Sequence, residues 1–254
     1  MSAWAAKKKT AYFLIVVATL LIVVGVPSFF ATRHAPTCSD GLQNQGEAGV
    51  DCGGSCALQC AFQVPEPIIR WARSFKVAPG VYNAVAMVEN TALDVGTDRI
   101  AYTFKLYDNR NVLIAERAGE TFLPPKRLAP IFEGGIRTGE RTPSRTFFEF
   151  SAVPVWKRVP PKEDSALVVA NTTLRDEASR PRLEATVSNT AIRTVRGIEV
   201  VAVIYDKNDN AIAASKTLVD SLPKDASARL VFTWFEPFSA PVGRTEIISR
   251  VKPQ

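Results

Sequence analysis

VENTALDVGTDRIAYTFKLYDNRNVLIA, residues 88–115, is the stretch that indicates the fold, because its pattern returns as VSNTAIRTVRGIEVVAVIYDKNDNAIA at residues 187–213. Both copies begin with V-x-N-T-A, continue into a β-branched and aromatic run that ends in Tyr-Asp, and then enter a turn that contains Asn. A further pair of strings follows them, FEFSA at 148–152 and FEPFSA at 235–240. The repeat predicts two related modules of about 95 residues, the size of an immunoglobulin-like sandwich of about seven strands.

The strand character of the repeat shows in residues 100–107, where apolar and polar side chains alternate. The large apolar residues fall on one face, which we expect to be buried: Ile100, Tyr102, Phe104 and Leu106. From about Ala61 onward, short runs of this kind are separated by Pro, Gly, Asn and Asp. The predicted fold class is all-β, with two tandem immunoglobulin-like β-sandwiches, at residues 63–160 and 161–254, behind one N-terminal transmembrane helix.

The first copy also contains the string Phe104-Lys-Leu-Tyr-Asp108, followed by a polar turn and an apolar strand. This string resembles the FxLYD family of small extracytoplasmic β-sandwich domains. The second copy departs from the motif, because Ala202 replaces the leading Phe and Ile204 replaces the Leu. The resemblance implies a fold and an extracytoplasmic location, and no catalytic role accompanies the Tyr-Asp pair.

The turn of the second copy, Asp206-x-Asn208-x-Asn210, imitates the opening of a calcium loop. However, the sixth position is Ala211 rather than Gly, and the twelfth is Thr217 rather than Glu. Asn and Asp tolerate the left-handed conformations that tight turns require. We therefore interpret this segment as a hairpin turn.

An apolar stretch at residues 11–31 precedes the β-rich body, and no charged residue lies between Lys9 and Arg33. At about 1.5 Å per helical residue, the stretch spans a bilayer core of about 30 Å. The basic cluster before it, Lys7, Lys8 and Lys9, keeps that end in the cytoplasm. We expect a single-pass cell-membrane protein with a cytoplasmic tip and transmembrane helix at residues 1–33 and an extracytoplasmic C-terminal body.

A cleavable signal peptide is the competing interpretation of this stretch. Its apolar region would be shorter, about 7–15 residues, and would end at small residues spaced as A-x-A. Here Phe29 occupies the third position before a cleavage after Ala31. The pattern therefore favours a retained anchor.

All four cysteines fall in a neck at residues 34–62, just after the apolar stretch: Cys38, Cys52, Cys56 and Cys60. Outside the cytoplasm, an even number of clustered cysteines predicts two disulfides, with three possible connectivities. The neck resembles a short Cys, Gly and Asp-rich motif, C-x-D-G-x-x-N-x-x-E-x-G-V-D-C-G-G, which recurs beside repeat and sandwich domains in bacterial surface proteins. That resemblance implies no activity.

Two metal interpretations compete with the disulfides. Zinc could use four thiolates, although the C-x3-C-x3-C run with a distant Cys38 lacks the two short pairs of a common structural site. Calcium could use the hard oxygen ligands of the glycine-rich loop: Asp40, Asn44, Glu47 and Asp51. Solvated turn residues would have the same composition. No other cofactor is predicted.

The sequence is poor in catalytic residues. The single histidine, His34, lies beside the apolar stretch, and no Gly-rich phosphate loop is present. The formal net charge of +6 includes the three N-terminal lysines, and the remainder is too dispersed for nucleic-acid binding. We therefore expect no enzyme and no nucleic-acid partner.

The best candidate for a binding site is a basic, Pro and Gly-bearing loop predicted within residues 124–146, with a solvated hairpin extension as the alternative. Its basic residues are Lys126, Arg127, Arg137, Arg141 and Arg145. We expect a membrane-anchored extracytoplasmic scaffold or binding protein that contacts envelope proteins or an anionic cell-wall polymer. The alternative function is a calcium- or zinc-dependent sensor or enzyme that uses the neck.

Overall fold

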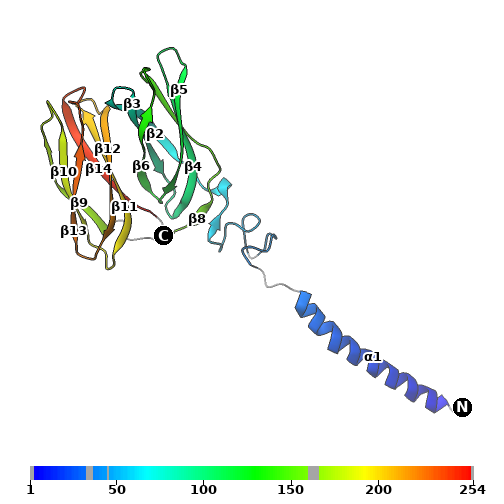
Figure 1. Ribbon diagram of the computed structural model, residues 1–254. Helices are drawn as coiled ribbons and strands as arrows, with labels where there is room; N and C mark the ends of the chain where they lie inside the picture. The colour runs from blue at the N-terminus through cyan, green and yellow to red at the C-terminus, as the bar shows by residue number, and fades with distance from the viewer. Residues whose placement is uncertain (1–2, 33–36, 45, 160–165, 253–254) are drawn as a thin grey trace. The chain divides into compact units, whose positions relative to one another are not determined.

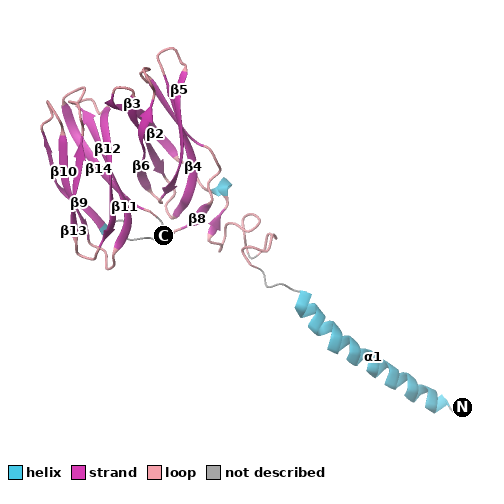
Figure 2. Cartoon of the chain, in the orientation of Figure 1, coloured by secondary structure: helices cyan, strands magenta, loops and turns pink. Residues whose placement is uncertain are grey.

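The computed structural model describes four stretches of the chain, residues 3–32, 37–44, 46–159 and 166–252. His34 therefore lies outside the described residues. The chain divides into two compact units, Met1–Cys56 and Ala57–Gln254. The first unit contains a helix and the cysteine-rich loops, and the second unit is built from strands (Figures 1 and 2).

Helix α1 spans Ala3–Thr32. Its segment Lys9–Ser28, 20 residues long, is apolar enough to cross a membrane, and none of it is buried inside the structure. Twenty residues at about 1.5 Å each cover roughly the 30 Å of a bilayer core. Pro27 falls near the end of the helix. The expected apolar helix is thus present.

The second unit opens with strand β1 and the 3-10 helix η1 (Ala61–Gln63). The strands of its first half are β1 (Leu58–Gln59), β2 (Ile68–Ala78), β3 (Val81–Asn90), β4 (Val95–Tyr107), β5 (Leu113–Leu123), β6 (Arg127–Arg137), β7 (Arg145–Phe150) and β8 (Trp156–Arg158). The strands of its second half are β9 (Leu167–Arg175), β10 (Arg182–Asn189), β11 (Val195–Asp206), β12 (Ala211–Leu222), β13 (Ser227–Thr233) and β14 (Val242–Val251).

The first half is a sandwich of two antiparallel sheets. One sheet has the order β2–β3–β6, and the other has the order β1–β8–β4–β5 with β7 also paired to β4. The predicted inward face of β4 is confirmed, because Ile100, Tyr102, Phe104 and Leu106 are all buried. The Phe104 and Phe148 rings lie 5.0 Å apart in this core. Both sheets supply its residues, among them Val88, Ile131 and Trp156.

The second half repeats this arrangement with the sheets β13–β10–β9 and β12–β11–β14. Its core draws on both sheets, because Leu183 and Phe232 pack with Ile198 and Ile204. The all-β sandwich architecture behind an N-terminal apolar helix is therefore confirmed.

A third apolar layer joins the two halves. Val85 and Met87 on β3 pack in one cluster with Val201, Val203 and Tyr205 on β11. Both strands are consequently buried on both faces. Their sequences, AVAMV at 84–88 and VVAVIY at 200–205, accordingly lack the alternation of a half-buried strand.

The shared V-x-N-T-A motif has the same structural role in both halves. Asn90 is fully buried, donates through Nδ2 to the carbonyls of Val95 and Pro124 at 2.8 and 3.0 Å, and accepts from the Ala92 N–H. Its counterpart Asn189 has the same pattern, with the carbonyls of Arg193, Leu222 and Pro223 as acceptors and the Ala191 N–H as donor. Each Asn therefore joins two loops at one corner of its sandwich.

The shared Tyr-Asp motif opens a hairpin in both halves. Asp108 Oδ1 accepts the main-chain N–H groups of Arg110 and Val112, at 2.8 and 3.0 Å. Asp206 Oδ1 accepts those of Asn208 and Asn210, at 2.8 and 2.9 Å. These main-chain bonds, above all those from Val112 and Asn210, hold the pKa of both carboxyls below the ordinary value. The interpretation of these segments as hairpin turns is confirmed.

The Glu184 carboxylate on β10 predicts a dependence of stability on pH. Glu184 accepts from Arg229 and Arg182 at 2.6 Å each, and these hydrogen bonds lower its pKa from 4.5 to about 2. Because the folded-state pKa is depressed, the stabilisation is present above pH 4.5 and is lost as the pH falls towards 2. We expect NMR titration to place the Glu184 midpoint near 2, and Arg229→Ala to move it towards 4.5. An unchanged midpoint in Arg229→Ala would contradict this assignment, and Arg99→Ala serves as the control.

Candidate functional site

The neck is held by disulfides. Cys38 and Cys56 are bonded, with Cα atoms 5.7 Å apart, and Cys52 and Cys60 are disulfide-bonded as well. None of the four cysteines is free. The disulfide prediction is confirmed, whereas the zinc alternative is wrong for this oxidised state because it requires thiolates.

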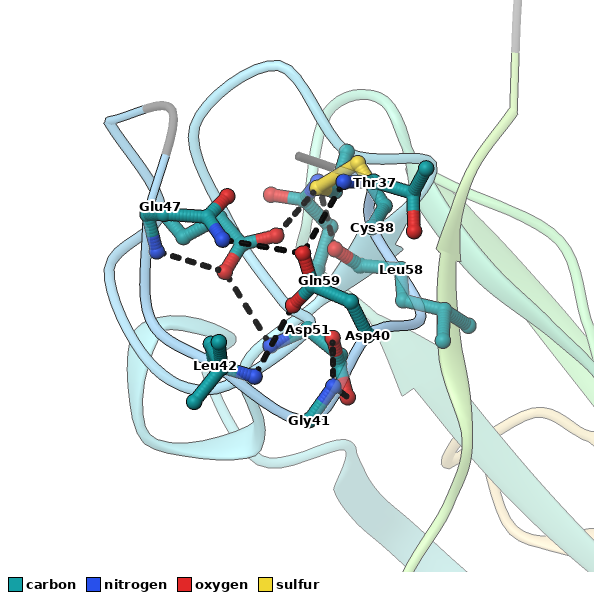
Figure 3. Close-up of a disulfide and its surroundings, with 11 residues drawn as sticks. Thr37, Cys38, Asp40, Gly41, Leu42, Glu47, Asp51, Leu58 and Gln59 are labelled. Atoms are coloured by element: carbon teal, nitrogen blue, oxygen red, sulfur yellow. Dashed lines mark hydrogen bonds between the residues drawn. A yellow bond between two sulfur atoms is a disulfide. The ribbon is translucent and has the colours of Figure 1, made fainter. Parts of the chain in front are cut away.

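Three of the four predicted calcium ligands, Asp40, Glu47 and Asp51, bind the main chain of one loop unit through their carboxylate oxygens (Figure 3). The fourth, Asn44, binds none through its side-chain oxygen, because its buried Oδ1 has no partner among the described residues. The buried Glu47 accepts through Oε2 from the N–H groups of Asn44 and Asp51, at 3.3 and 3.2 Å. The Asp51 carboxylate accepts from the Gly41 N–H at 3.1 Å. Asp40 accepts from Asn44 Nδ2 at 2.9 Å, which is the main reason why its pKa is lowered. These carboxylates act as turn-stabilising groups, and calcium would have to compete with their main-chain bonds.

Glu47 also lies beside the disulfide. Its Oε1 is 3.1 Å from Cys56 Sγ. A disulfide sulfur carries no proton to donate, so this is a close contact rather than a hydrogen bond. Cys38, Glu47 and Cys56 group their ligand-type atoms within 4.8 Å, but a disulfide sulfur is not the thiolate ligand that a metal requires.

The predicted basic loop at residues 124–146 is corrected, because Arg127–Arg137 form strand β6. This strand pairs with β3 from Arg127↔Asn90 to Arg137↔Val81. Pro130 is tolerated because β6 is an edge strand of its sheet. Gly134 and Gly135 form a bulge opposite Asn83, where the register between β6 and β3 shifts. Gly135 has a φ of 68°. The proline and glycines that suggested a loop thus belong to a strand, where Pro130 lies at the sheet edge and the glycines lie in a bulge.

The five basic residues consequently do not form one patch. Lys126 and Arg127 lie at one end of β6 and Arg137 at the other, about 30 Å away. Arg141 contacts Asp108 at 3.4 Å, and Arg145 donates to Asn111 Oδ1 at 3.0 Å. Arg141 and Arg145 therefore support the β4–β5 hairpin. The prediction that the five basic residues form one binding loop is wrong.

A groove that was not predicted from the sequence lies between the two halves of the second unit. It has a volume of about 810 Å³, and we call it the edge groove. Residues 72–77 of β2 and residues 211–215 of β12 line it without a break. A cavity against the face of a sheet would touch only alternate residues of a strand. The edge groove therefore runs along the edges of β2 and β12, which are terminal strands of their sheets.

Aromatic side chains form the walls of the edge groove. Phe147 and Phe235 are 55% and 73% exposed, although both are large and apolar. The Phe147 ring packs against Tyr107 at 5.4 Å, and Trp234 packs against Phe238 at 5.2 Å. Trp234 Nε1 is a buried donor without a partner among the described residues. Large apolar side chains exposed beside a groove are typical of binding surfaces.

Charged groups cross the edge groove. Lys76 Nζ lies 3.1 Å from the Glu236 carboxylate, and Arg73 donates to the Ala211 carbonyl at 3.1 Å and to Asn210 Oδ1 at 3.2 Å. Arg145 also lines the groove, so its described lining carries three cations and one carboxylate. A sequence signal for this site existed in the adjacent Phe147 and Phe148, because in a strand only one of two neighbours can face the core.

A second polar cluster lies around a cavity of about 480 Å³. Arg250 on β14 is buried and donates to Glu199 Oε2 at 2.6 Å and to Thr121 Oγ1 at 3.2 Å. Burial lowers the pKa of Arg250, and Glu199 opposes that effect. Tyr102 donates to Glu133 at 2.7 Å, and burial raises the pKa of the Tyr102 hydroxyl. We call the contacts of Arg250 with β5 and β11 the Arg250 junction.

Comparison with known proteins identifies no family for this chain. No family model and no curated protein matches the sequence. Among solved structures, red sea bream transglutaminase is similar, with 8% identity and a TM-score of 0.21. The similarity covers 71% of this chain and 31% of that structure, so the chain spans about a third of its length. A likeness this distant carries no argument about activity.

Proposed function

We propose that the chain is a membrane-anchored, extracytoplasmic binding protein without catalytic activity, and that its binding site is the edge groove. The exposure of Phe147 and Phe235 in that groove is the observation that carries the proposal. The proposed partners are envelope proteins or an anionic cell-wall polymer. The resemblance to FxLYD domains, which are immunoglobulin-like and extracytoplasmic, agrees with the proposal.

The membrane placement is supported by three features. Helix α1 contains a 20-residue apolar segment, the preceding lysines favour a cytoplasmic N-terminus, and disulfides persist in oxidising compartments. We expect protease added to intact cells to digest the strands of the second unit. We also expect the chain to stay with membranes in alkaline carbonate. Protection from external protease would contradict the orientation, and release by carbonate would favour a cleaved signal peptide.

The binding role is supported by the size and lining of the edge groove. Its volume lies within the range of about 300–1,000 Å³ that is usual for ligand sites. Hydroxyl, aromatic and basic side chains line it, and the described lining contains neither His nor Cys. Such a surface offers both apolar and polar contacts for recognition.

Paired substitutions test this role. We expect Phe235→Ser to lower recovery of crosslinked partners from native membranes at least about tenfold, because aromatic anchors dominate binding energy. Phe62→Ser is the matched control, since Phe62 is 76% exposed and lies outside the edge groove. Equal recovery from both variants would contradict the assignment of the binding site.

A further inference from the structure

We propose that the edge groove binds an extended acidic polypeptide segment, which adds as a strand to the free edge of β2. This inference rests on the proposed function and specifies the class of partner. Three features of the groove support it: an unpaired strand edge, an excess of positive charge, and exposed aromatic residues in its lining.

The unpaired edge comes from the position of β2. Within the described part of the chain, β2 pairs only with β3. Their register is regular from Trp71↔Met87 to Lys76↔Tyr82 and shifts on either side. In an antiparallel pair, every second residue directs its N–H and C=O away from the partner strand. The regular stretch, about 20 Å long, therefore presents main-chain groups to the groove, and these fit the main chain of another extended segment.

The charge of the edge selects the chemistry of that segment. Arg73 and Lys76 lie on the regular part of β2. With Arg145 they make three cations in the described lining of the groove, which has Glu236 as its one carboxylate. Positive side chains on an edge strand oppose indiscriminate pairing. They favour a strand with Asp or Glu, because oppositely charged cross-strand neighbours stabilise a sheet.

The Lys76–Glu236 ion pair does not prevent such binding. Its side chains are 47% and 49% exposed, so the pair contributes little to stability. A carboxylate of an incoming segment can replace Glu236 as the partner of Lys76. Phe147 and Phe235 in the lining then offer apolar contacts to side chains of the incoming segment.

A sugar polymer is the alternative occupant. It would use the aromatic walls and the cations, but it has no main-chain N–H and C=O groups in strand spacing. The unbroken lining by consecutive residues of β2 and β12 is the feature that favours a polypeptide.

The test uses the full chain in lipid nanodiscs and a phage-displayed random library of peptides of about eight residues. We expect enriched peptides with acidic and apolar residues in alternation. Lys76→Glu should weaken the best synthetic peptide at least about tenfold in fluorescence anisotropy. Lys157→Glu is the matched control, because the Lys157–Asp98 pair has a similar exposure, 48% and 47%, and lies outside the groove.

N-methylation of the peptide distinguishes strand addition from other modes of peptide binding. Methyl groups on one alternating set of amides should abolish binding, whereas methyl groups on the other set should leave it within about threefold, because only one set faces β2. Equal effects of the two sets would overturn strand addition. A library without groove-dependent binders would overturn the polypeptide assignment. If Phe235→Ser still lowered recovery of crosslinked partners, the proposed function would stand and only this inference would fail.

Discussion

Replacement of Arg250 by Met should lower the free energy of unfolding of the second unit by roughly 2–4 kcal/mol, between the values for exposed and fully buried ion pairs. The Arg250 side chain is 6% exposed and its partner Glu199 is 25% exposed. The guanidinium also lies 4.6 Å from the centre of the Phe122 ring. Loss of Arg250 leaves a half-buried carboxylate without its cation, and urea denaturation measures the effect.

Two further variants isolate the Arg250 junction. Arg250→Met combined with Glu199→Leu should recover much of the lost stability, because no unpaired charge then remains. Arg244→Met, at a site 46% exposed with two carboxylate partners, should cost no more than about 1 kcal/mol. If Arg250→Met destabilised no more than Arg244→Met, the junction would not hold the two halves together. Because Arg250 on β14 reaches Thr121 on β5, this contact fixes one half against the other.

Replacement of Asn90 or Asn189 by Ala should each cost roughly 2–4 kcal/mol. Each substitution leaves one buried main-chain N–H and at least two carbonyls without the amide that satisfies them. Asn→Asp at either site keeps the shape of the side chain but replaces the donating Nδ2 with an oxygen, which cannot donate to the carbonyls that it faces. This substitution should therefore cost at least as much as Asn→Ala. Thermal or urea unfolding of the four variants measures these effects.

The exposed Asn109 provides the control for the two corner residues. Asn109→Ala should stay within about 0.5 kcal/mol of the parent chain. Similar losses at Asn90 and Asn189 would support an equivalent role in the two halves. A loss at either site as small as that of Asn109→Ala would contradict the corner role.

Local patterns in the sequence predicted the elements that depend on local chemistry. The alternation around Phe104 gave the inward face of β4, and the Tyr-Asp strings gave both hairpin turns. The clustering of cysteines gave the disulfides. These features depend on neighbours a few residues away, which a sequence displays directly.

Features that depend on distant contacts were missed. Pro130 and Gly135 suggested a loop because their roles as edge proline and bulge glycine exist only when β6 pairs with β3. The apolar layer at Val85 and Val203 requires the two halves to pack together. The edge groove likewise arises from strand edges that are more than a hundred residues apart in the chain, β2 and β12.

Photo-crosslinking from within the edge groove tests the binding function and its location together. A photoreactive phenylalanine is placed at Phe235, or at Phe62 as the control, and intact cells are illuminated. We expect a crosslinked product from position 235 alone, and we expect protease added outside the cells to digest it. A product of equal yield from position 62, or a product protected inside the cell, would contradict an exported binding protein that acts through this groove.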